Sequence, residues 1–387
     1  MDTVVKPNWP VKKLGEVAEI NPSKRDVLDL PPSTEVTFVP MSAVDEGSGA
    51  IVSPEVRKLG EVMGGYTYFA ENDVLFAKIT PCMENGKVAM AENLVNNLGF
   101  GSTEFHVLRA KQGIAPEWIY AYLRRDSFRE EAEKHMTGTA GQKRVQKEYL
   151  ENVPIPIPPH KTQKAIVERL DAIKKTQELN DEQISLAGEL FESLLQKEIH
   201  YKRDWPIRRI GELARFINGY PFSPADWKTE GFPIIRIQNL NDKSKSYNYF
   251  PGKLEDKYLV KGGDILVSWS ASLGVYLWSG GPAWLNQHIF KVIEDPKLVD
   301  HIYLYFALLT ILEELKTKVH GGTMKHVTKR PFEETTIPTP SIEKQRMIAQ
   351  KLSAVREYKK KLLKQKELLQ ELFSSTLAKA MKGELLK

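Results

Sequence analysis

The sequence repeats itself, and this repeat constrains the fold more than any other feature. Residues 9–18 (WPVKKLGEVA) return 196 positions later as residues 205–214 (WPIRRIGELA). Near the other end of the copy, residues 155–158 (IPIP) return 182 positions later as residues 337–340 (IPTP). A chain made of two copies of one unit tends to bind a partner that is itself two-part, so the repeat bears on function as well as on fold.

The offset between the copies shrinks along the chain. It is 196 at Trp9, 191 at Asp73 and 182 at Ile155. The first copy therefore holds 14 more residues than the second, the difference between 196 and 182, and they are spread over several loops. A common frame with different loops is typical of one scaffold that presents two different recognition surfaces.

The composition places the chain among ordinary soluble globular proteins, with 41% hydrophobic and 27% charged residues. Its 387 residues fit two copies of a unit of roughly 190 residues. The net charge of +5 and the pI near 8.9 are mildly basic. That balance is compatible with a nucleic-acid partner but does not require one.

Three sequence features bear on compartment. The longest apolar stretch, residues 302–312 (IYLYFALLTIL), is too short to span a bilayer, so we predict a buried or amphipathic helix there. Residues 1–6 lack the apolar core of a signal peptide. The single cysteine, Cys82, excludes an intrachain disulfide and an all-cysteine metal site. We expect a cytoplasmic protein without a membrane partner.

A long helix is predicted after each of two proline strips, residues 154–159 and 338–340, since proline ends regular structure. In both helices apolar residues recur close to an a/d spacing. They are Ile166, Leu170, Ile173, Ile184, Ala187, Leu190, Phe191 and Leu194 in the first, and Ile348, Leu352, Val355, Leu362, Leu369 and Phe373 in the second.

Each helical segment has about 40 residues, hence a length of roughly 60 Å, and needs a partner to cover its apolar stripe. We predict that the two helices pair as a coiled coil. Polar residues at Gln177, Asn180, Lys359 and Lys366 would then set the register. The alternative is two surface helices, each packed on its own domain.

The part before each long helix has an α/β pattern. Residues 69–77 and 259–268 each predict a turn followed by an apolar strand that opens at Asp73 or Asp264. A second strand pair is predicted at residues 104–108 and 288–292, and a helix with aromatic spacing at 118–123 and 301–306. The ranges stand in the same order in both copies.

Motifs for catalysis are missing from the sequence. It has no phosphate-binding P-loop, no Gly-rich dinucleotide turn and no Asn-Pro-Pro-aromatic motif of amino-methyltransferases. The eight histidines form no H-E-x-x-H pattern or His/Cys cluster, which argues against a structural metal. The E-x-K spacing at residues 255–257 is frequent by chance. We predict a chain that is not an enzyme and holds no cofactor.

Binding loops are better supported than catalysis. Residues 138–145 (GTAGQKRV) correspond to residues 321–327 (GGTMKHV), and both are glycine-hinged loops with a hydroxyl and adjacent cations. Glycine lets the backbone approach a phosphate, and Lys, Arg and Gln reach phosphates or base edges. A solvated basic loop is the alternative, but recurrence in both halves favours binding.

Further polar clusters follow predicted strands. Residues 78–87 (KITPCMENGK) follow the first Asp73 strand, and Trp269 with the serines after it follows the second. Amide-rich clusters stand at residues 236–239 and 286–288, and amides suit the paired donor and acceptor of adenine. Loop capping is an equally simple explanation for each cluster.

These motifs resemble those of the specificity subunits of Type I restriction-modification systems, over essentially the whole chain. The resemblance rests on the twin W-P-x-x-x-[LI]-G-E starts at Trp9 and Trp205 and on residues 76–87 (FAKITPCMENGK). Residues 138–145 and the proline strips that enter Gln163 and Gln345 complete it.

The resemblance implies an α/β fold with two repeated target recognition domains joined by two long helices that form an antiparallel coiled coil. The expected segments are residues 1–159 and 201–340 for the recognition domains and 160–200 and 341–387 for the spacer helices. Each domain would read one half of a bipartite sequence in double-stranded DNA.

The resemblance also implies partners. Two modification (methyltransferase) subunits would dock on the helices and carry S-adenosylmethionine, and restriction subunits would join through them and consume ATP. The predicted DNA-binding residues share exposed loop positions and polar or cationic side chains. They are Lys78, Thr80, Lys87, Thr139, Gln142, Lys143, Arg144, Arg236, Gln238, Asn239, Ser270, Gln287, Thr323, Lys325 and His326.

Two other functions remain open from the sequence. One is a coiled-coil scaffold that binds protein and has no DNA specificity, and the other is a nuclease or methyltransferase with an unrecognised site. Salt-dependent binding to duplex DNA separates the scaffold from a DNA reader, because phosphate contacts release counterions.

Overall fold

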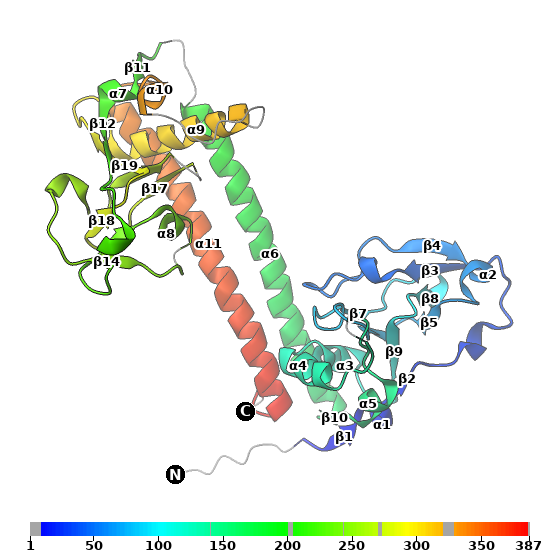
Figure 1. Cartoon of the computed structure of the whole chain (residues 1–387). Coiled ribbons are helices and arrows are strands. Elements are labelled where there is room, and N and C mark those ends of the chain that lie inside the picture. The colour runs from blue at the N-terminus through cyan, green and yellow to red at the C-terminus, as the bar shows by residue number, and fades with distance from the viewer. Residues whose placement is uncertain are drawn as a thin grey trace. The chain divides into compact units, whose positions relative to one another are not determined.

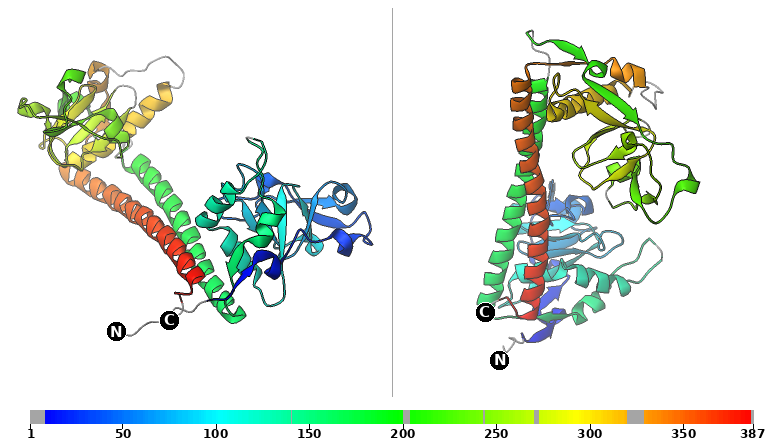
Figure 2. Two further views of the ribbon diagram at one scale, coloured as in Figure 1. Left: turned by 60° about the horizontal axis from the view of Figure 1, so that its bottom comes forward. Right: turned by 90° about the vertical axis from the view of Figure 1, so that its left-hand side faces the viewer.

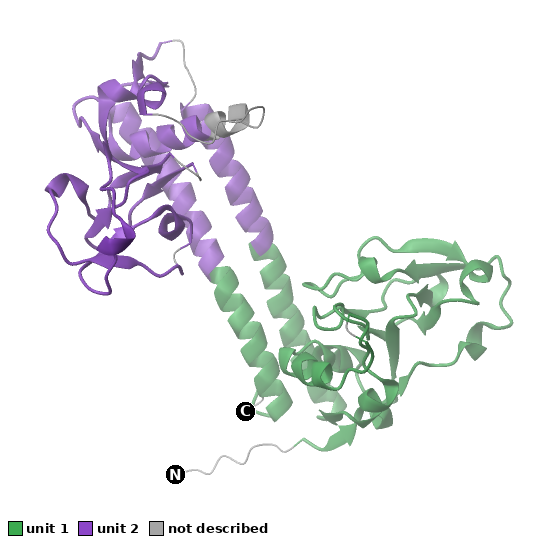
Figure 3. Cartoon of the chain, in the orientation of Figure 1, with its two compact units in different colours: residues 1–180, 365–387 green, residues 181–364 purple. Residues whose placement is uncertain are grey.

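The computed structural model describes residues 9–139, 141–199, 204–242, 244–269, 273–319 and 329–385. The chain forms two compact units (Figure 3). Unit 1 contains residues 1–180 and 365–387, and unit 2 contains residues 181–364. Both long helices are divided between the units, and the segment boundaries expected from the sequence stay a prediction.

Unit 1 contains three small sheets. One four-stranded sheet has the order β2-β9-β6-β7, with strands Ala18–Ile20, Phe105–Ala110, Val74–Ala77 and Val88–Met90. The other has the order β4-β3-β8-β5, with strands Glu55–Lys58, Glu35–Val39, Leu98–Gly101 and Thr67–Ala70. A two-stranded sheet pairs β1 (Val11–Lys13) with β10 (Pro154–Pro156). The pair β3–β8 is parallel, and the remaining pairs are antiparallel.

Unit 2 repeats this arrangement, and adding ten to each strand label of unit 1 gives its counterpart. Its first sheet is β12-β19-β16-β17, with strands Ala214–Asn218, Ile289–Glu294, Ile265–Ser268 and Gly274–Leu277. The second is β14-β13-β18-β15, with strands Asn248–Phe250, Phe232–Ile235, Ala283–Leu285 and Leu259–Val260. The third pairs β11 (Ile207–Arg209) with β20 (Thr336–Pro338).

Helices complete each unit (Figure 1). Unit 1 has α1 (Leu14–Val17), α2 (Leu59–Val62), α3 (Pro116–Leu123), α4 (Asp126–Lys134) and α5 (Lys147–Asn152). Unit 2 has α7 (Ile210–Leu213), α8 (Ile237–Asn241), α9 (His301–Val319) and α10 (Lys329–Glu333). The apolar stretch 302–312 is thus the buried part of a helix, as predicted. No helix among the described residues is long and apolar enough to cross a bilayer.

The glycine of the W-P-x-x-x-[LI]-G-E start lies in close contact with another helix in both units, which is a reason for this motif to recur. A Cβ on Gly15 would lie 3.2 Å from the backbone of Glu151 in α5, and a Cβ on Gly211 would lie 3.0 Å from Glu333 in α10. The short helix after each start therefore packs directly on the helix before the proline strip, and a larger residue than glycine would push the two helices apart.

The long helices are α6 (His160–Ile199) and α11 (Ile342–Lys382), and they lie side by side in the views of Figures 1 and 2. In unit 1 the beginning of α6 packs against the end of α11, where Ile166 and Leu170 share one core with Leu377. In unit 2 the end of α6 packs against the beginning of α11, where Lys351 Nζ lies 3.1 Å from Glu198 Oε1. The pairing is antiparallel, so the predicted coiled coil is confirmed.

The seam between the helices differs in one place from the predicted spacing. Leu190 is 51% exposed, whereas Ala187 and Leu195 are buried and Phe191 is half-buried. Leu190 was therefore wrongly included in the apolar stripe. Phe191, which the stripe also contains, is the neighbour that turns inward, with its ring centroid 5.9 Å from that of Phe306 in α9. Asn180 is 2% exposed, so one predicted polar intrusion does lie inside.

A buried glutamine fixes each long helix to the sheets before it. Gln163 Oε1 accepts a hydrogen bond from the Ala115 amide at 2.9 Å, and its Nε2 donates to the Pro158 carbonyl at 2.8 Å. Gln345 does the same with the Asp300 amide at 2.7 Å and the Pro340 carbonyl at 2.9 Å. Both glutamines are fully buried. Proline has no amide hydrogen to donate. The glutamine side chain instead links each proline strip to the segment before α3 or α9 by donating to a proline carbonyl and accepting from a backbone amide.

This geometry predicts the effect of removing a junction glutamine. Gln345→Ala leaves a buried amide and a buried carbonyl without partners, so we expect it to lower the free energy of unfolding by about 1–3 kcal/mol. Gln350→Ala, an exposed position of the same helix, is the matched control. Urea unfolding followed by tryptophan fluorescence measures both. Equal stability of the two variants would contradict the structural role of Gln345.

Candidate nucleic-acid interface

Two segments that the sequence analysis treated separately lie together in unit 1. The Val145 amide donates to the Lys78 carbonyl at 2.9 Å, and the Thr80 amide donates to the Lys143 carbonyl at 3.0 Å. Thr137 and Arg144 exchange both backbone hydrogen bonds, at 3.0 and 2.8 Å. Residues 137–145 therefore form a hairpin, here called the basic hairpin, whose second arm pairs antiparallel with the segment that follows β6.

Glycines shape the tip of the basic hairpin. Gly138 has φ of 126° and Gly141 has φ of 79°, both in the region that favours glycine. Between and beside them Thr139, Gln142 and Lys143 are exposed. Three of the predicted DNA-binding residues therefore stand on one protruding turn, free to reach a partner.

Arg144 has a different place from its neighbour Lys143. Its guanidinium binds the Glu104 carboxylate in a bidentate manner, with Nε–Oε2 at 2.9 Å and Nη2–Oε1 at 2.8 Å. This hydrogen bonding holds the pKa of Glu104 below its usual value and raises the pKa of Arg144. Its Nη1 also donates to the Gln142 carbonyl at 2.9 Å. Arg144 therefore anchors the hairpin to the turn between β8 and β9.

His106 supports the base of the hairpin from inside. Its Nε2 lies 2.9 Å from the Val145 carbonyl oxygen, so this nitrogen carries a proton, and its Nδ1 then accepts from Asn21 Nδ2 at 3.1 Å. Burial lowers the pKa of His106 from its ordinary value near 6.5. The neutral imidazole is the form that makes both contacts.

The remaining predicted residues of unit 1 lie in the segment between β6 and β7, Lys78 and Thr80 at its start and Lys87 at its end. Lys87 Nζ donates to the carbonyls of Met41 at 3.3 Å and Val44 at 2.7 Å, so it ties down a loop of its own unit. Thr80 Oγ1 donates to Glu84. Lys78 is half-buried, and burial lowers the pKa of its ammonium group.

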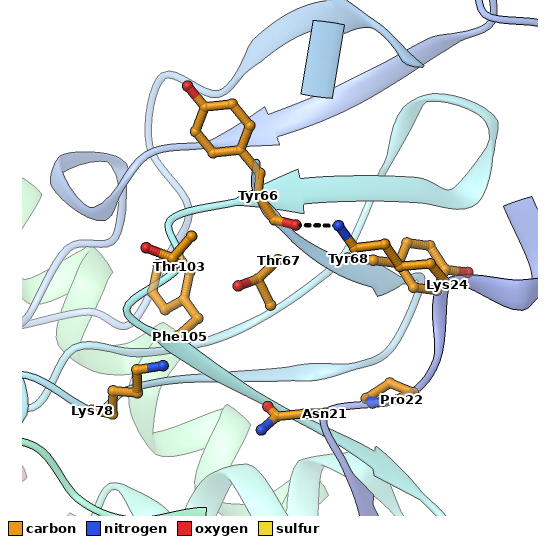
Figure 4. A pocket seen from close by; sticks show the side chains of 9 residues that line it. All are labelled: Asn21, Pro22, Lys24, Tyr66, Thr67, Tyr68, Lys78, Thr103 and Phe105. Atoms are coloured by element: carbon orange, nitrogen blue, oxygen red, sulfur yellow. Dashed lines mark hydrogen bonds between the residues drawn. The ribbon is translucent and has the colours of Figure 1, made fainter. Parts of the chain in front are cut away.

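Lys78 lines a pocket of about 250 Å³ in unit 1 (Figure 4). Apart from Pro22, the lining residues are polar, cationic or aromatic. They are Asn21, Pro22, Lys24, Tyr66, Thr67, Tyr68, Lys78, Thr103 and Phe105. Lys24 holds one wall in place, because its Nζ donates to the carbonyls of Met63 at 2.8 Å and Tyr66 at 2.7 Å.

In unit 2 the two amide clusters meet at the ends of the parallel strands β13 and β18. The Asn286 amide donates to the Ile235 carbonyl at 3.2 Å, so the segments after both strands lie side by side. Gln238 and Gln287 are exposed there. Loops that follow the carboxyl ends of adjacent parallel strands are the usual place for ligand contacts in open sheets.

Two predicted residues of unit 2 are engaged within the unit. Asn239 is 2% exposed, and its Nδ2 donates to the carbonyls of Lys245 and Ser246, both at 3.1 Å. Arg236 places its guanidinium 4.8 Å from the Trp227 ring and donates to Asn248 Oδ1 at 3.1 Å. Loop capping, the alternative named for these clusters, accounts for the contacts of Asn239. Four predicted residues lie outside the described part of the chain: Ser270, Thr323, Lys325 and His326.

The sequence analysis missed Thr103, Asn21 and the tyrosines of the pocket. The internal repeat held a signal for Thr103, because it follows β8 as Gln287 follows β18. The two positions are also matched by a backbone hydrogen bond, since the Ser102 amide donates to the Val39 carbonyl at 3.2 Å, as Asn286 does to Ile235. Asn21 follows β2, whereas Tyr66 lies just before β5 and Tyr68 lies within it, and none of them belongs to a motif quoted from the repeat.

Reactive or metal-binding groups do not add to this interface. Across the described ranges, no group of three or more His, Cys, Asp or Glu side chains is placed to hold a metal ion. Burial raises the pKa of the Cys82 thiol, which keeps it protonated and unreactive. Glu255 and Lys257 of the E-x-K sequence pair with each other at 2.9 Å. The interface is suited to binding.

Comparison with known proteins identifies the family. The model of the Type I restriction modification DNA specificity domain matches twice, at residues 6–186 and 202–372. The chain belongs to this family. The resemblance seen in the motifs is thereby confirmed, and each match covers one copy of the internal repeat.

Specificity subunits are also found among its individual relatives. The chain is 40% identical over 160 residues to the Type I restriction enzyme EcoEI specificity subunit of Escherichia coli, which covers 41% of this chain and 26% of that protein. The match to this relative thus spans about a quarter of the relative's length.

Solved structures agree with the fold of this specificity-domain protein. A chain from a structure of complex assembly and conformational transition of the type I R-M system has a TM-score of 0.64 at 23% identity, with 99% of this chain and 100% of that chain covered. The HsdS subunit from Thermoanaerobacter tengcongensis has a TM-score of 0.53 at 23% identity, with 98% of both chains covered. The predicted α/β architecture with two long helices is confirmed.

The contacts of His106 predict a pH effect on stability. The unfolded histidine takes up a proton near pH 6.5, whereas the folded one does so only at lower pH, so its contribution to stability is present above about pH 6.5 and is lost as the pH falls. We expect the melting temperature of the native chain to fall more steeply below this pH than that of His106→Gln. Parallel pH profiles for the two proteins would rule this role out.

Proposed function

We propose that this chain is the sequence-recognition subunit of a Type I restriction-modification complex and reads a bipartite site in double-stranded DNA. Residues 1–159 and 201–340 each read one half-site, and residues 160–200 and 341–387 form the spacer. The carrying observation is the repeated scaffold with different exposed polar side chains at matching places, such as Thr103 and Gln287. Two readers of different chemistry suit a target with two unlike halves.

The exposed members of the predicted set are the DNA contacts in this proposal. In unit 1 they are Thr139, Gln142 and Lys143 on the basic hairpin, and in unit 2 they are Gln238 and Gln287 beyond the parallel strands. Lys87, Arg144 and Asn239 support these surfaces from behind through the hydrogen bonds described above. Lysine on a protruding turn supplies phosphate affinity, and the amides supply base discrimination.

The long helices are the docking site for two modification subunits in this proposal. Apolar side chains about half exposed stand on α6 and α11 in both units: Leu179, Leu368 and Leu372 in unit 1, and Leu186, Leu190, Met347, Tyr358 and Leu363 in unit 2. Exposed apolar rows on a helix are typical of a surface that another helix covers. Because each unit has its own set of these side chains, the helices could bind two copies of the same partner, one at each unit.

Chemistry belongs to the partners in this proposal. The modification subunits bring S-adenosylmethionine and methylate the DNA, and restriction subunits join through them and use ATP. The complex works on chromosomal and incoming DNA in the cytoplasm. The competing proposal, a scaffold that binds only protein, also accounts for the exposed apolar rows but gives no reason for the basic hairpin.

Domain exchange tests the proposal directly. Replacing residues 1–159 with the corresponding part of another specificity subunit should change one half of the methylated site and leave the other half unchanged, because each unit has its own sheets and core. Methylation mapping of DNA from a host that carries the chimera and the modification subunit gives the result. A change in both halves, or the absence of any defined methylated site with the native chain, would refute the proposal.

Lys143 provides a second test. Lys143→Ala should weaken binding to all duplexes alike and reduce the slope of log affinity against log salt by about 0.9, since one phosphate contact is lost. Lys134→Ala is the matched control, because Lys134 is exposed on α4 and pairs with Glu131 at 2.9 Å. Fluorescence anisotropy over a salt series measures both variants. An unchanged slope for Lys143→Ala would assign the basic hairpin to the solvated surface.

A further inference from the structure

The pocket of unit 1 has a chemistry that favours a hydrogen-bond acceptor. Two of its nine lining residues, Lys24 and Lys78, are cations, and none is a carboxylate. Threonines 67 and 103 and Asn21 add polar groups. The volume of about 250 Å³ is far above the ~15 Å³ that one water needs. An anionic or carbonyl oxygen from a larger molecule would fit this lining better than a cation or an apolar group.

The two lysines of the pocket differ in their hydrogen bonding. Lys24 donates to two carbonyls, so its ammonium group is committed to the wall. The ammonium of Lys78 is directed into the pocket (Figure 4) and donates no hydrogen bond to any residue that the structure describes. Glu104, the carboxylate whose charge acts on the pKa of Lys78, already has both oxygens bound by Arg144. Lys78 is therefore a half-buried donor with its donor capacity unused.

Unit 2 carries a different side chain at the same place. Trp269 follows β16 as Lys78 follows β6, and the Trp269 amide donates to the His288 carbonyl at 3.2 Å as the Lys78 amide donates to that of Glu104 at 2.9 Å. Trp269 stacks on Phe290 with ring centroids 5.7 Å apart and lies 5.1 Å from the His288 ring. One scaffold position thus bears a cation in one unit and an indole in the other.

We propose that the pocket of unit 1 binds an acceptor oxygen of DNA on Lys78 Nζ, and that position 78 and its counterpart 269 are a point where the two units differ in what they read. This inference rests on the proposed function. Two sources of the oxygen share this chemistry, a backbone phosphate and the O6 edge of guanine, which lysine contacts together with N7. Tyr68 and Phe105 also line the pocket.

The test uses the full chain and three variants. Lys78→Met removes the charge and keeps the length, Lys78→Arg keeps the charge, and Lys134→Met is the exposed control. Binding is measured by anisotropy on a random-sequence 30-base-pair duplex over a salt series. The methylated site is mapped in a host that carries each variant with the modification subunit. Melting temperatures confirm that the variants fold.

A phosphate contact predicts weaker binding of Lys78→Met to the random duplex, a salt slope smaller by about 0.9, and an unchanged methylated site. A guanine contact predicts an unchanged slope and a loss, on the order of 10-fold, of the preference for guanine at one position of one half-site. In both cases Lys78→Arg should retain more of the native behaviour than Lys78→Met, and Lys134→Met should match the native chain.

The proposal is overturned if Lys78→Met keeps the native affinity, salt slope and methylated site. If Lys143→Ala still reduces the salt slope in that case, only the role of the pocket is refuted. The proposed DNA-reading function then stands, because it is tested by a different residue. A native chain that binds no duplex and directs no methylation would instead remove the function and the pocket's role together.

Discussion

The hydrogen bonds of two buried glutamines determine how the rest of the structure is organised. Proline strips interrupt the backbone hydrogen bonding between each group of sheets and its long helix, and a flexible connection would be the default at such a break. Gln163 and Gln345 close the gap by bonding a carbonyl of the strip and the amide of the residue just before α3 or α9. The direction in which each helix leaves its sheets is therefore set by side-chain contacts that are inaccessible to water.

The same junction is reinforced by a different residue in each unit. Trp118 Nε1 donates to the Pro156 carbonyl at 2.9 Å, and Tyr303 Oη donates to the Pro338 carbonyl at 2.7 Å. An indole and a phenol thus supply one hydrogen bond at equivalent places. Exchange of residue type is tolerated at this site because the donor position is kept. The loops differ from this junction in that their side-chain chemistry is not kept. Lys78 and Trp269 make equivalent backbone contacts, but their side chains differ in charge and shape.

The sequence allowed the repeated architecture to be predicted because its signals are local. Apolar periodicity, proline strips and the Asp73 and Asp264 turns each act within a few residues. The roles of individual polar residues were harder to predict, because they depend on partners distant in the chain. Lys87 and Asn239 are residue types that often bind ligands. Their side-chain donors, however, form hydrogen bonds with carbonyls of their own unit. The pocket around Lys78 was not predicted, since its lining comes from four separate stretches of sequence.

The composition of the units has a consequence for synthesis of the protein. Unit 2 is one continuous stretch, residues 181–364, whereas unit 1 takes its final piece from residues 365–387. That piece places Leu377, Ala380 and Met381 in the core of unit 1, and the Ala380 carbonyl accepts a hydrogen bond from Trp9 Nε1 at 3.1 Å. Residues 1–180 must therefore wait for residues 365–387 to be synthesised. Unit 2 can complete its core earlier, and the sheets of unit 1 keep an uncovered apolar face until residues 365–387 have left the ribosome.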